Sequence, residues 1–270
     1  DGSDHRAIAS STASFSSPRW APDGKRLAYV SSHEGSVQIY LRWMDTGQVA
    51  RLTDLTASPS SLSWSPDGRQ IAFTMPVAAE AAKPFGELPK KPEGAEWAPE
   101  VRVIDSLNYR ADGLKGFLPA EYEQIFMIPA DGGTPRQLSK GDFPHNSSLS
   151  WSTDSKTLYF SANRSEDWDY EPLESELYAL QLNDGSIQQL TKRIGPDRSP
   201  RVSPDGKKIA YLGFDDKQGL YENNDVYVMS IDGSDNRLLS GKLDRSIDAL
   251  EWTADGKGFV VQYDDSGESI

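Results

Sequence analysis

The residues of this chain that could perform acid–base or nucleophilic chemistry are few and scattered. Only three histidines occur, His5, His33 and His145, and there is no cysteine. The sequence has no G-x-S-x-G elbow for a serine nucleophile, no H-E-x-x-H, no P-loop and no G-x-G-x-x-G. No histidine lies beside a nucleophile pattern, so we expect all three at the surface. The sequence therefore predicts no catalytic residue in this chain.

One segment does gather chemical groups, because Ala162–Ser175 is both acidic and aromatic. Its carboxylates include Glu166, Asp167 and Asp169. Such a loop is either a solvated connection, which is the favoured interpretation, or a site that attracts a metal ion or the amino terminus of a peptide. The calcium-loop pattern D-x-[DN]-x-[DN]-G is absent, so we expect no metal and no other cofactor.

Two repeated patterns predict the elements that must position this loop. The first reads W-A-P-D-G-K-R-L-A-Y-V from Trp20 and returns from Trp64, Trp151, Val202 and Trp252. Proline presets the backbone of a turn, aspartate caps that turn, and glycine takes the positive φ that closes a tight hairpin. The apolar positions after each turn alternate with a period of two, which is typical of β-strands.

The second pattern lies between copies of the first. It is a short apolar strand, an Asp-Gly-type turn and a closing strand, and it starts at Gln38, Gln124, Glu176 and Asp225. Each repeat then holds four antiparallel strands in about 45 residues, which is the signature of a β-propeller blade. We therefore predict an all-β fold, a β-propeller of four-stranded antiparallel blades, with tryptophans packed between neighbouring blades.

The repeats also predict the domain boundaries, and the propeller they describe is incomplete. The N-terminal D-G-S-D resembles the turn at Asp232, and Gly258–Tyr263 supplies a second strand before the chain stops without a third. We expect this chain to be a segment of a longer protein. The predicted full blades are about 16–57, 58–143, 144–195 and 196–247, with partial blades at 1–12 and 248–270 and an insertion at 75–122 within the second blade.

The long connections are predicted to lie on one face. Because strands alternate in direction, every connection from a second to a third strand emerges opposite the Pro-Asp-Gly turns. Met75–Tyr122 and Ala162–Ser175 are such connections, so we expect both at the same rim. Long loops on one face of a rigid scaffold mark a binding surface or a domain interface.

The amino-acid composition excludes some classes of binding partner. Lys plus Arg is 28 and Asp plus Glu is 41, a net charge of −13, so a phosphate backbone would be repelled and we expect no nucleic acid partner. No apolar run is long enough for a transmembrane helix, so we expect no membrane partner. The absence of cysteine fits the cytoplasm and the periplasm equally well.

Four longer motifs carry a family resemblance that spans nearly the whole chain. They are I-D-S-L-N-Y-R-A-D-G from Ile104, I-F-M-I-P-A-D-G-G-T-P-R-Q-L from Ile125, S-A-N-R-S-E-D-W-D-Y from Ser161 and S-P-D-G-K-K-I-A-Y from Ser203. Together they resemble the propeller of the prolyl oligopeptidase family of serine peptidases, in the acylaminoacyl-peptidase and dipeptidyl-peptidase branch. The Pro-Asp-Gly repeats alone are shared with TolB-type propellers.

The resemblance implies partners and a role. In that family the propeller caps an α/β-hydrolase domain with a Ser, Asp and His triad, filters substrates by size, and in dipeptidyl peptidases holds the substrate amine with acidic residues. It implies a C-terminal hydrolase domain of the same polypeptide, a peptide substrate, and an amine-binding role for Glu166, Asp167 or Asp169, although the adjacent Glu-Glu pair of the best-known member is absent. Export signals among bacterial relatives favour the periplasm over the cytoplasm.

Three functions follow as hypotheses. The leading one is the non-catalytic gating region of a serine peptidase that cleaves short peptides. The alternative is a stand-alone TolB-type propeller that acts as a protein-interaction module. A propeller lyase with a metal in its central channel is disfavoured because histidine is scarce.

The purified chain is predicted to have no amidase or esterase activity, because it lacks an activated nucleophile. Aminoacyl and dipeptidyl chromogenic substrates provide the measurement. Hydrolysis that stays with the protein through repeated purification would contradict the prediction.

Overall fold

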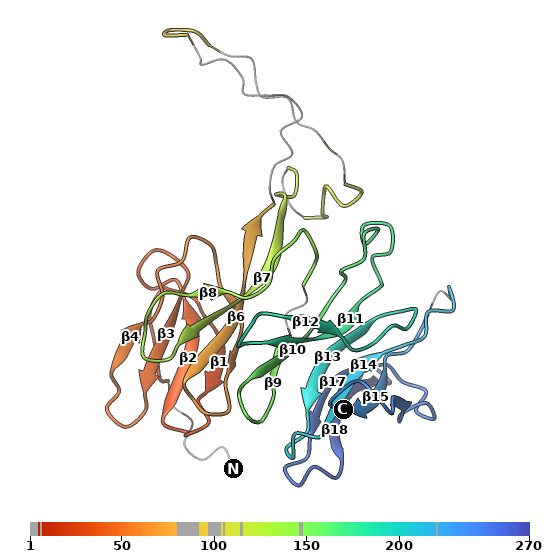
Figure 1. The fold of residues 1–270 in the computed structure, drawn as a ribbon. Coiled ribbons are helices and arrows are strands. Elements are labelled where there is room, and N and C mark those ends of the chain that lie inside the picture. Colours follow the sequence, from red (N-terminus) through yellow and green to blue (C-terminus); the bar gives the residue numbers. More distant parts are fainter. Residues whose placement is uncertain are drawn as a thin grey trace.

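The computed structural model describes residues 5, 7–79, 92–96, 104, 106–113, 116–145, 148–219 and 221–270. These residues form strands, turns and loops, with no helix among them. The described part of the chain therefore also has no helix long and apolar enough to cross a membrane. Figure 1 shows the strands gathered into small separate sheets that follow one another along the chain.

Four of the sheets have four strands and the last has three. The first contains β1 (Phe15–Trp20), β2 (Arg26–Ser31), β3 (Gln38–Trp43) and β4 (Val49–Arg51); the second contains β5 (Ser60–Trp64), β6 (Gln70–Ala78), β7 (Glu121–Pro129) and β8 (Arg136–Gln137). The third contains β9 (Ser150–Trp151), β10 (Thr157–Ala162), β11 (Glu176–Gln181) and β12 (Ile187–Gln189). The fourth contains β13 (Asp197–Val202), β14 (Lys208–Gly213), β15 (Asp225–Ser230) and β16 (Arg237–Leu238), and the fifth contains β17 (Ile247–Trp252), β18 (Phe259–Asp265) and β19 (Glu268–Ser269).

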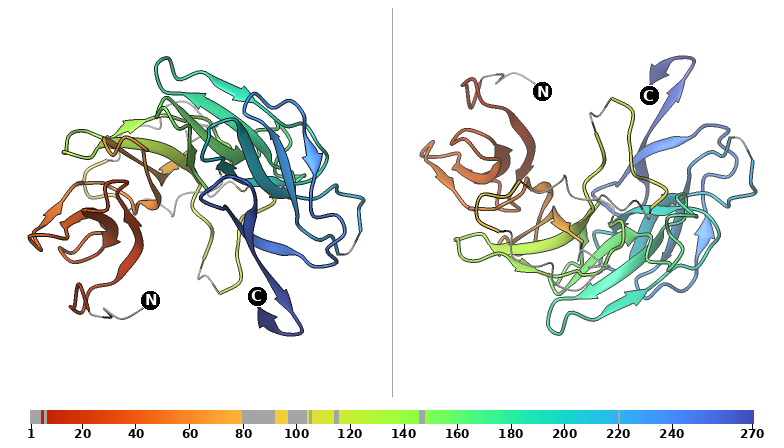
Figure 2. Two further views of the ribbon diagram at one scale, coloured as in Figure 1. Left: turned by 90° about the horizontal axis from the view of Figure 1, so that it is seen from below. Right: turned by 90° about the horizontal axis from the view of Figure 1, so that it is seen from above.

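The arrangement is the predicted β-propeller. Within each sheet the strands follow chain order and pair antiparallel. The first strand of each sheet is innermost, since β1 contacts β5, β9 contacts β13, and β13 contacts β17. Figure 2 shows the sheets following an arc, with the described ends of the chain on the same side of the molecule.

The C-terminal partial blade differs from the prediction in one respect. The fifth sheet holds a short third strand, β19, which pairs with β18 through Asp264 with Ser269 and Asp265 with Glu268. A tight turn at Gly267, with φ of +86°, folds the chain back, which the sequence pattern did not reveal. At the other end, residues 5 and 7–12 lie in no strand and the rest of 1–12 lies outside the described residues, so a blade strand there stays a prediction.

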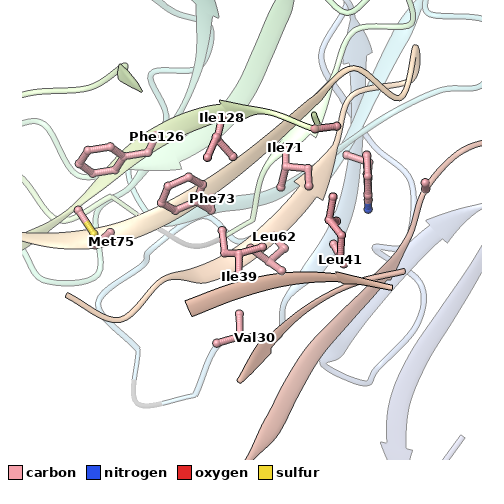
Figure 3. Close-up of a cluster of buried hydrophobic side chains, with 13 residues drawn as sticks. Val30, Ile39, Leu41, Leu62, Ile71, Phe73, Met75, Phe126 and Ile128 are labelled. Carbon is pink, nitrogen blue, oxygen red and sulfur yellow. The ribbon is translucent and has the colours of Figure 1, made fainter. Parts of the chain in front are cut away.

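The hydrophobic core lies between the blades and not within any one of them. Four clusters of buried side chains each join two successive sheets. In the first cluster, Ile39 and Leu41 of β3 pack with Leu62 of β5 and with Ile71 and Phe73 of β6 (Figure 3). Burying a large apolar side chain contributes roughly 1.5–3 kcal/mol, so each blade depends on its neighbours for stability.

In three of the four pairs of successive sheets, a tryptophan at the end of an inner strand also makes a hydrogen bond to the preceding sheet; β13 has Val202 at this position. The indole Nε1 of Trp64 donates to the carbonyl oxygen of Arg19 at 3.0 Å, and that of Trp151 donates to Ser63 at 3.3 Å. Trp252 makes the same bond to the fourth sheet at 2.8 Å. The predicted packing of tryptophans between blades is therefore confirmed at these positions.

The Pro-Asp-Gly turns are held as the sequence predicts. In the second blade the Ser65 hydroxyl donates to Asp67 Oδ1 at 2.6 Å, and the Arg69 amide donates to the same oxygen at 3.0 Å. Gly68 takes the positive φ of +69° that closes the turn. Because each aspartate at these turns accepts hydrogen bonds within its own turn, turn geometry explains why aspartate is present there.

Replacement of Trp64 by alanine is expected to lower the free energy of unfolding by about 3–5 kcal/mol, the usual cost of emptying a large aromatic site in a core. Trp64 is 7% exposed and packs between two blades, whereas Trp20 occupies the same position of the first blade and is 56% exposed. Trp20→Ala is therefore the matched control, with a loss below about 1 kcal/mol. Urea unfolding measures both, and equal losses would contradict the prediction.

Candidate functional site

The predicted meeting of the insertion and the acidic loop at one rim is confirmed for the described residues. The Leu107 amide donates to Asp169 Oδ2 at 2.6 Å, which joins the insertion to the loop 162–175. The rings of Tyr122 and Trp168 meet edge to face with centroids 5.6 Å apart. In Figure 1 the connection that follows β10 rises on the same side as the ends of β6 and β7.

The described end of the insertion packs on itself before it meets the loop. The Leu118 amide donates to the Tyr109 carbonyl oxygen at 2.9 Å, and the Arg110 guanidinium lies 4.9 Å from the centre of the Phe117 ring. A cavity of about 580 Å³ lies between this segment and Trp168. The rim thus offers an aromatic hollow beside the acidic loop.

The three predicted site residues are not brought together. Asp169 is directed to the insertion, where it accepts the Leu107 amide. Asp167 is exposed and accepts a hydrogen bond from the Ser165 hydroxyl, which lowers the pKa of its carboxyl, and it lines a separate pocket. Glu166 is exposed to solvent. Asp167 is therefore the one of the three that the fold places with other acids.

That separate pocket lies between the outer parts of the third and fourth blades and has a volume of about 850 Å³. We call it the acidic pocket, and its charged lining residues are Arg164, Asp167, Glu171, Glu174, Glu176, Asp216 and Lys217. Five carboxylates face two cations there. Sequence analysis had Glu171 and Glu174 in its acidic segment, but it missed Glu176 and Asp216.

Glu176 occupies a position that the blades repeat, at the start of the third strand. In the first blade this position is Gln38, whose Oε1 accepts the Thr53 hydroxyl at 2.8 Å, while the Thr53 oxygen accepts the Ile39 amide at 2.9 Å. Gln124 and Ser139 make the same latch in the second blade. The latch closes the fourth strand onto the third with a neutral amide as acceptor.

In the third blade the acceptor of this latch is a carboxyl group. The Thr191 hydroxyl donates to Glu176 Oε2 and accepts the Leu177 amide at 2.9 Å. Burial, together with the nearby charges of Asp197 and Glu174, raises the pKa of Glu176 to about 7. Alignment of the repeats was the signal that could have found Glu176, because it shows glutamate where two blades have glutamine.

A buried ion pair lies next to the latch and joins the same two blades. The Asp197 carboxylate is fully buried and pairs with Arg193, whose guanidinium also lies 3.2 Å from Asp215 and 3.8 Å from the centre of the Tyr227 ring. Burial raises the pKa of Asp197 to about 6, although the Arg193 charge opposes this. The pair fixes the third blade against the fourth below the pocket.

His145 is not the surface residue that the sequence suggested, whereas His5 and His33 are exposed. Its side chain is 4% exposed and packs against Phe160, and Arg164 Nη1 donates to its Nε2 at 2.8 Å. Burial, and then the Arg164 charge, lower the pKa of His145 to about 4. The imidazole is therefore a neutral acceptor that positions Arg164 at the pocket, and it is not a base.

The chemistry available at this rim is electrostatic. Among the described residues no group of three or more histidine, aspartate or glutamate side chains is placed to hold a metal ion. A pocket with excess carboxylate attracts an ammonium group, and the attraction is stronger where water is partly excluded. The aromatic hollow on the other side of the acidic loop can hold apolar side chains.

Two family models match parts of the chain. Residues 1–80 match the model described as TolB beta propeller domain, and residues 109–211 match the dipeptidyl peptidase IV (DPP IV) N-terminal region.

Similar proteins include peptidases. The uncharacterized peptidase YuxL of Bacillus subtilis is 31% identical over 150 residues, which are 55% of this chain and 22% of the relative. Dipeptidyl-peptidase 5 of Porphyromonas gingivalis is 23% identical over 273 residues, 96% of this chain and 38% of the relative. The acylaminoacyl peptidase structure of Pyrococcus horikoshii superposes with a TM-score of 0.65 at 18% identity, covering 94% of this chain and 36% of that one. The chain thus spans less than two fifths of each of these proteins.

The wild-type protein is expected to lose stability as pH rises. Replacement of Glu176 by glutamine should make this loss smaller. A carboxyl whose pKa is raised by folding stabilises the fold below its unfolded value near 4.5, and this contribution is lost as pH passes about 7. Between pH 5 and pH 8 the wild type should lose about 1–2 kcal/mol more than Glu176→Gln, which is less than the full linkage value because the side chain is part exposed.

Urea unfolding at both pH values measures the difference. Gln124→Glu is the matched control, because it places a carboxyl in the latch of the second blade and should add a similar loss. The same pH dependence in the wild type and Glu176→Gln would contradict the assignment.

Proposed function

Because the chain is a propeller segment of the prolyl oligopeptidase family, we propose that it is the non-catalytic, substrate-access region of a serine peptidase that cleaves short peptides. The observation that carries the proposal is the rim where the insertion contacts the acidic loop. Asp169 and Trp168 join these two connections, and Asp167 contributes to the acidic pocket beside them. The rim would face an α/β-hydrolase domain of the same polypeptide.

Access would be limited by the width of the propeller centre. The inner strands of four sheets, together with residues 148–149 before β9, line a cavity of about 750 Å³. An α-helix with its side chains is already about 10–12 Å wide, so a folded domain would be too large for a cavity of this volume. A short extended peptide has a smaller cross-section and could enter.

The acidic pocket would select among peptides by charge. A free amino terminus carries a positive charge near neutral pH, and Asp167, Glu171 and Glu174 would attract it. Arg164, positioned by His145, would keep the carboxylates from binding a second cation. This role belongs to Asp167 and its neighbours and not to Asp169, which already accepts the Leu107 amide.

A stand-alone TolB-type propeller is the second candidate. The match of residues 1–80 to the TolB beta propeller domain favours it, and the apolar side chains exposed on the rim, such as Leu107 and Tyr109, would then contact a protein partner. The two candidates differ in a simple way, because only the peptidase requires a G-x-S-x-G elbow in the same polypeptide.

Asp167→Asn in the full-length protein is predicted to raise the KM for dipeptide substrates with a free amine by about tenfold, and to spare amino-blocked ones. Asp169→Asn is the matched control, because its carboxylate holds the insertion and not the amine. That change should affect both substrate types equally. Kinetics with paired free and blocked chromogenic dipeptides provide the measurement.

Equal effects of Asp167→Asn on the two substrate types would remove amine recognition from the proposal. The absence of any peptidase activity in the full-length protein would overturn the peptidase assignment itself.

A further inference from the structure

The centre of the propeller contains a cavity that is chemically unlike the rim. Its lining comes from β1, β5, β13 and β17 and from residues 148–149, which lead into β9, so every sheet contributes. Pro22, in the first Pro-Asp-Gly turn, also lines it, which places the cavity toward the face opposite the long loops. Its charged residues are Arg19, Arg201 and Glu251.

The two arginines are presented by the same local structure. Each follows a Ser-Pro dipeptide, and Ser17 and Ser199 take left-handed φ values of 54° and 55° at a bulge of the inner strand. Each guanidinium donates from Nη1 to the carbonyl oxygen of the preceding proline, at 2.9 Å for Arg19 and 3.0 Å for Arg201. Ser61 takes the same left-handed φ, 56°, at the bulge of β5, so this serine conformation is not confined to the strands that carry the arginines. It is followed by Pro-Arg at Ser17 and Ser199 and by Leu-Ser at Ser61, so the first and fourth blades place an arginine at this point of the strand and the second does not.

The two arginines differ in the residue that the neighbouring blade places beside them. Arg201 Nε lies 2.9 Å from Glu251 Oε1, on the inner strand of the next sheet. At the equivalent place beside Arg19 the next sheet has Ser63, and across the described residues Arg19 forms no ion pair. The Arg19 backbone is nevertheless fixed, because its carbonyl oxygen accepts the Trp64 indole.

We propose that this central cavity is a binding site for a single carboxylate group, with Arg19 as the main ligand residue and Arg201 as the second. Two guanidinium groups and one carboxylate leave a single positive charge in the cavity, in a chain whose net charge is −13. A singly charged anion balances that charge, whereas a phosphate dianion would leave an excess of negative charge.

The chemistry of the donors also fits a carboxylate. An arginine fork pairs with the two oxygens of a carboxylate through parallel hydrogen bonds, which adds both strength and orientation. The ligand carboxylate can be a peptide C-terminus or an Asp or Glu side chain. The site shares the central cavity with the access route of the proposed function but uses no residue of the acidic pocket, so the test of amine recognition can fail while the carboxylate site stands.

The test uses the purified chain labelled with 5-fluorotryptophan, followed by ¹⁹F NMR. Trp20 and Trp64 line the cavity, and Trp168 lies at the rim as an internal control. Three probes are titrated: Ac-Ala-Ala-Ala with a free C-terminal carboxylate, the same peptide with a C-terminal amide, and Ac-Ala-Asp-Ala-amide. We expect the first or the third probe, or both, to shift the cavity resonances and leave Trp168 unchanged. The fully capped neutral peptide should have no effect.

Three variants test which residues bind the carboxylate. Arg19→Gln should weaken carboxylate binding by about tenfold or more, and Glu251→Gln should tighten it several-fold because it releases Arg201. Arg136→Gln, on the outer strand of the second blade, is the surface control and should change nothing. Circular dichroism reports whether each variant folds, and Glu251→Gln tests the site even if Arg19→Gln does not fold.

The two carboxylate probes identify the source of the group. Binding of the free C-terminus alone assigns a terminal carboxylate, and binding of the aspartate peptide alone assigns an acidic side chain. Equal binding of the amide-capped peptide, no shift with either carboxylate probe, or no effect of Glu251→Gln would each overturn the proposal.

Discussion

A four-stranded antiparallel sheet cannot bury both of its faces by itself, and this constraint governs the whole molecule. Each blade obtains its core from its neighbours, so the buried apolar residues fall into four clusters that join successive sheets. At three of these four joints an inner-strand tryptophan adds a directional bond, from the indole of one blade to a carbonyl oxygen of the previous one. Loop positions and inner-strand positions are thereby fixed relative to one another.

Because the joints are rigid, the rim can carry groups that would destabilise a core. Glu176 replaces a glutamine in a latch that the other blades close with a neutral amide or with aspartate. Its carboxyl is part buried near Asp197, and the Thr191 hydroxyl and the Arg193 charge oppose the effect of burial and of the neighbouring acids. The fourth blade has Asp225 as the acceptor at the same position, outside the acidic pocket, so a carboxyl group is compatible with closing the latch.

The charges of the protein are separated along the axis of the propeller. Carboxylates gather at the elaborated rim, while the inner strands present Arg19 and Arg201 toward the opposite face. The proposed ammonium site and the proposed carboxylate site therefore lie in different parts of the molecule. The acidic loop itself is divided, since Asp167 belongs to the pocket and Asp169 to the contact with the insertion.

The sequence by itself determined the blades, because turn chemistry and strand periodicity are local and are repeated at every Pro-Asp-Gly motif. It also determined which loops share a rim, because strand alternation fixes the side on which each connection emerges. It could not determine that Glu166, Asp167 and Asp169 are directed apart, because neighbours in sequence are sorted by contacts with residues such as Leu107, far along the chain. The burial of His145 and the pairing of Arg201 but not Arg19 were likewise decided by tertiary structure, because each depends on which blade lies alongside.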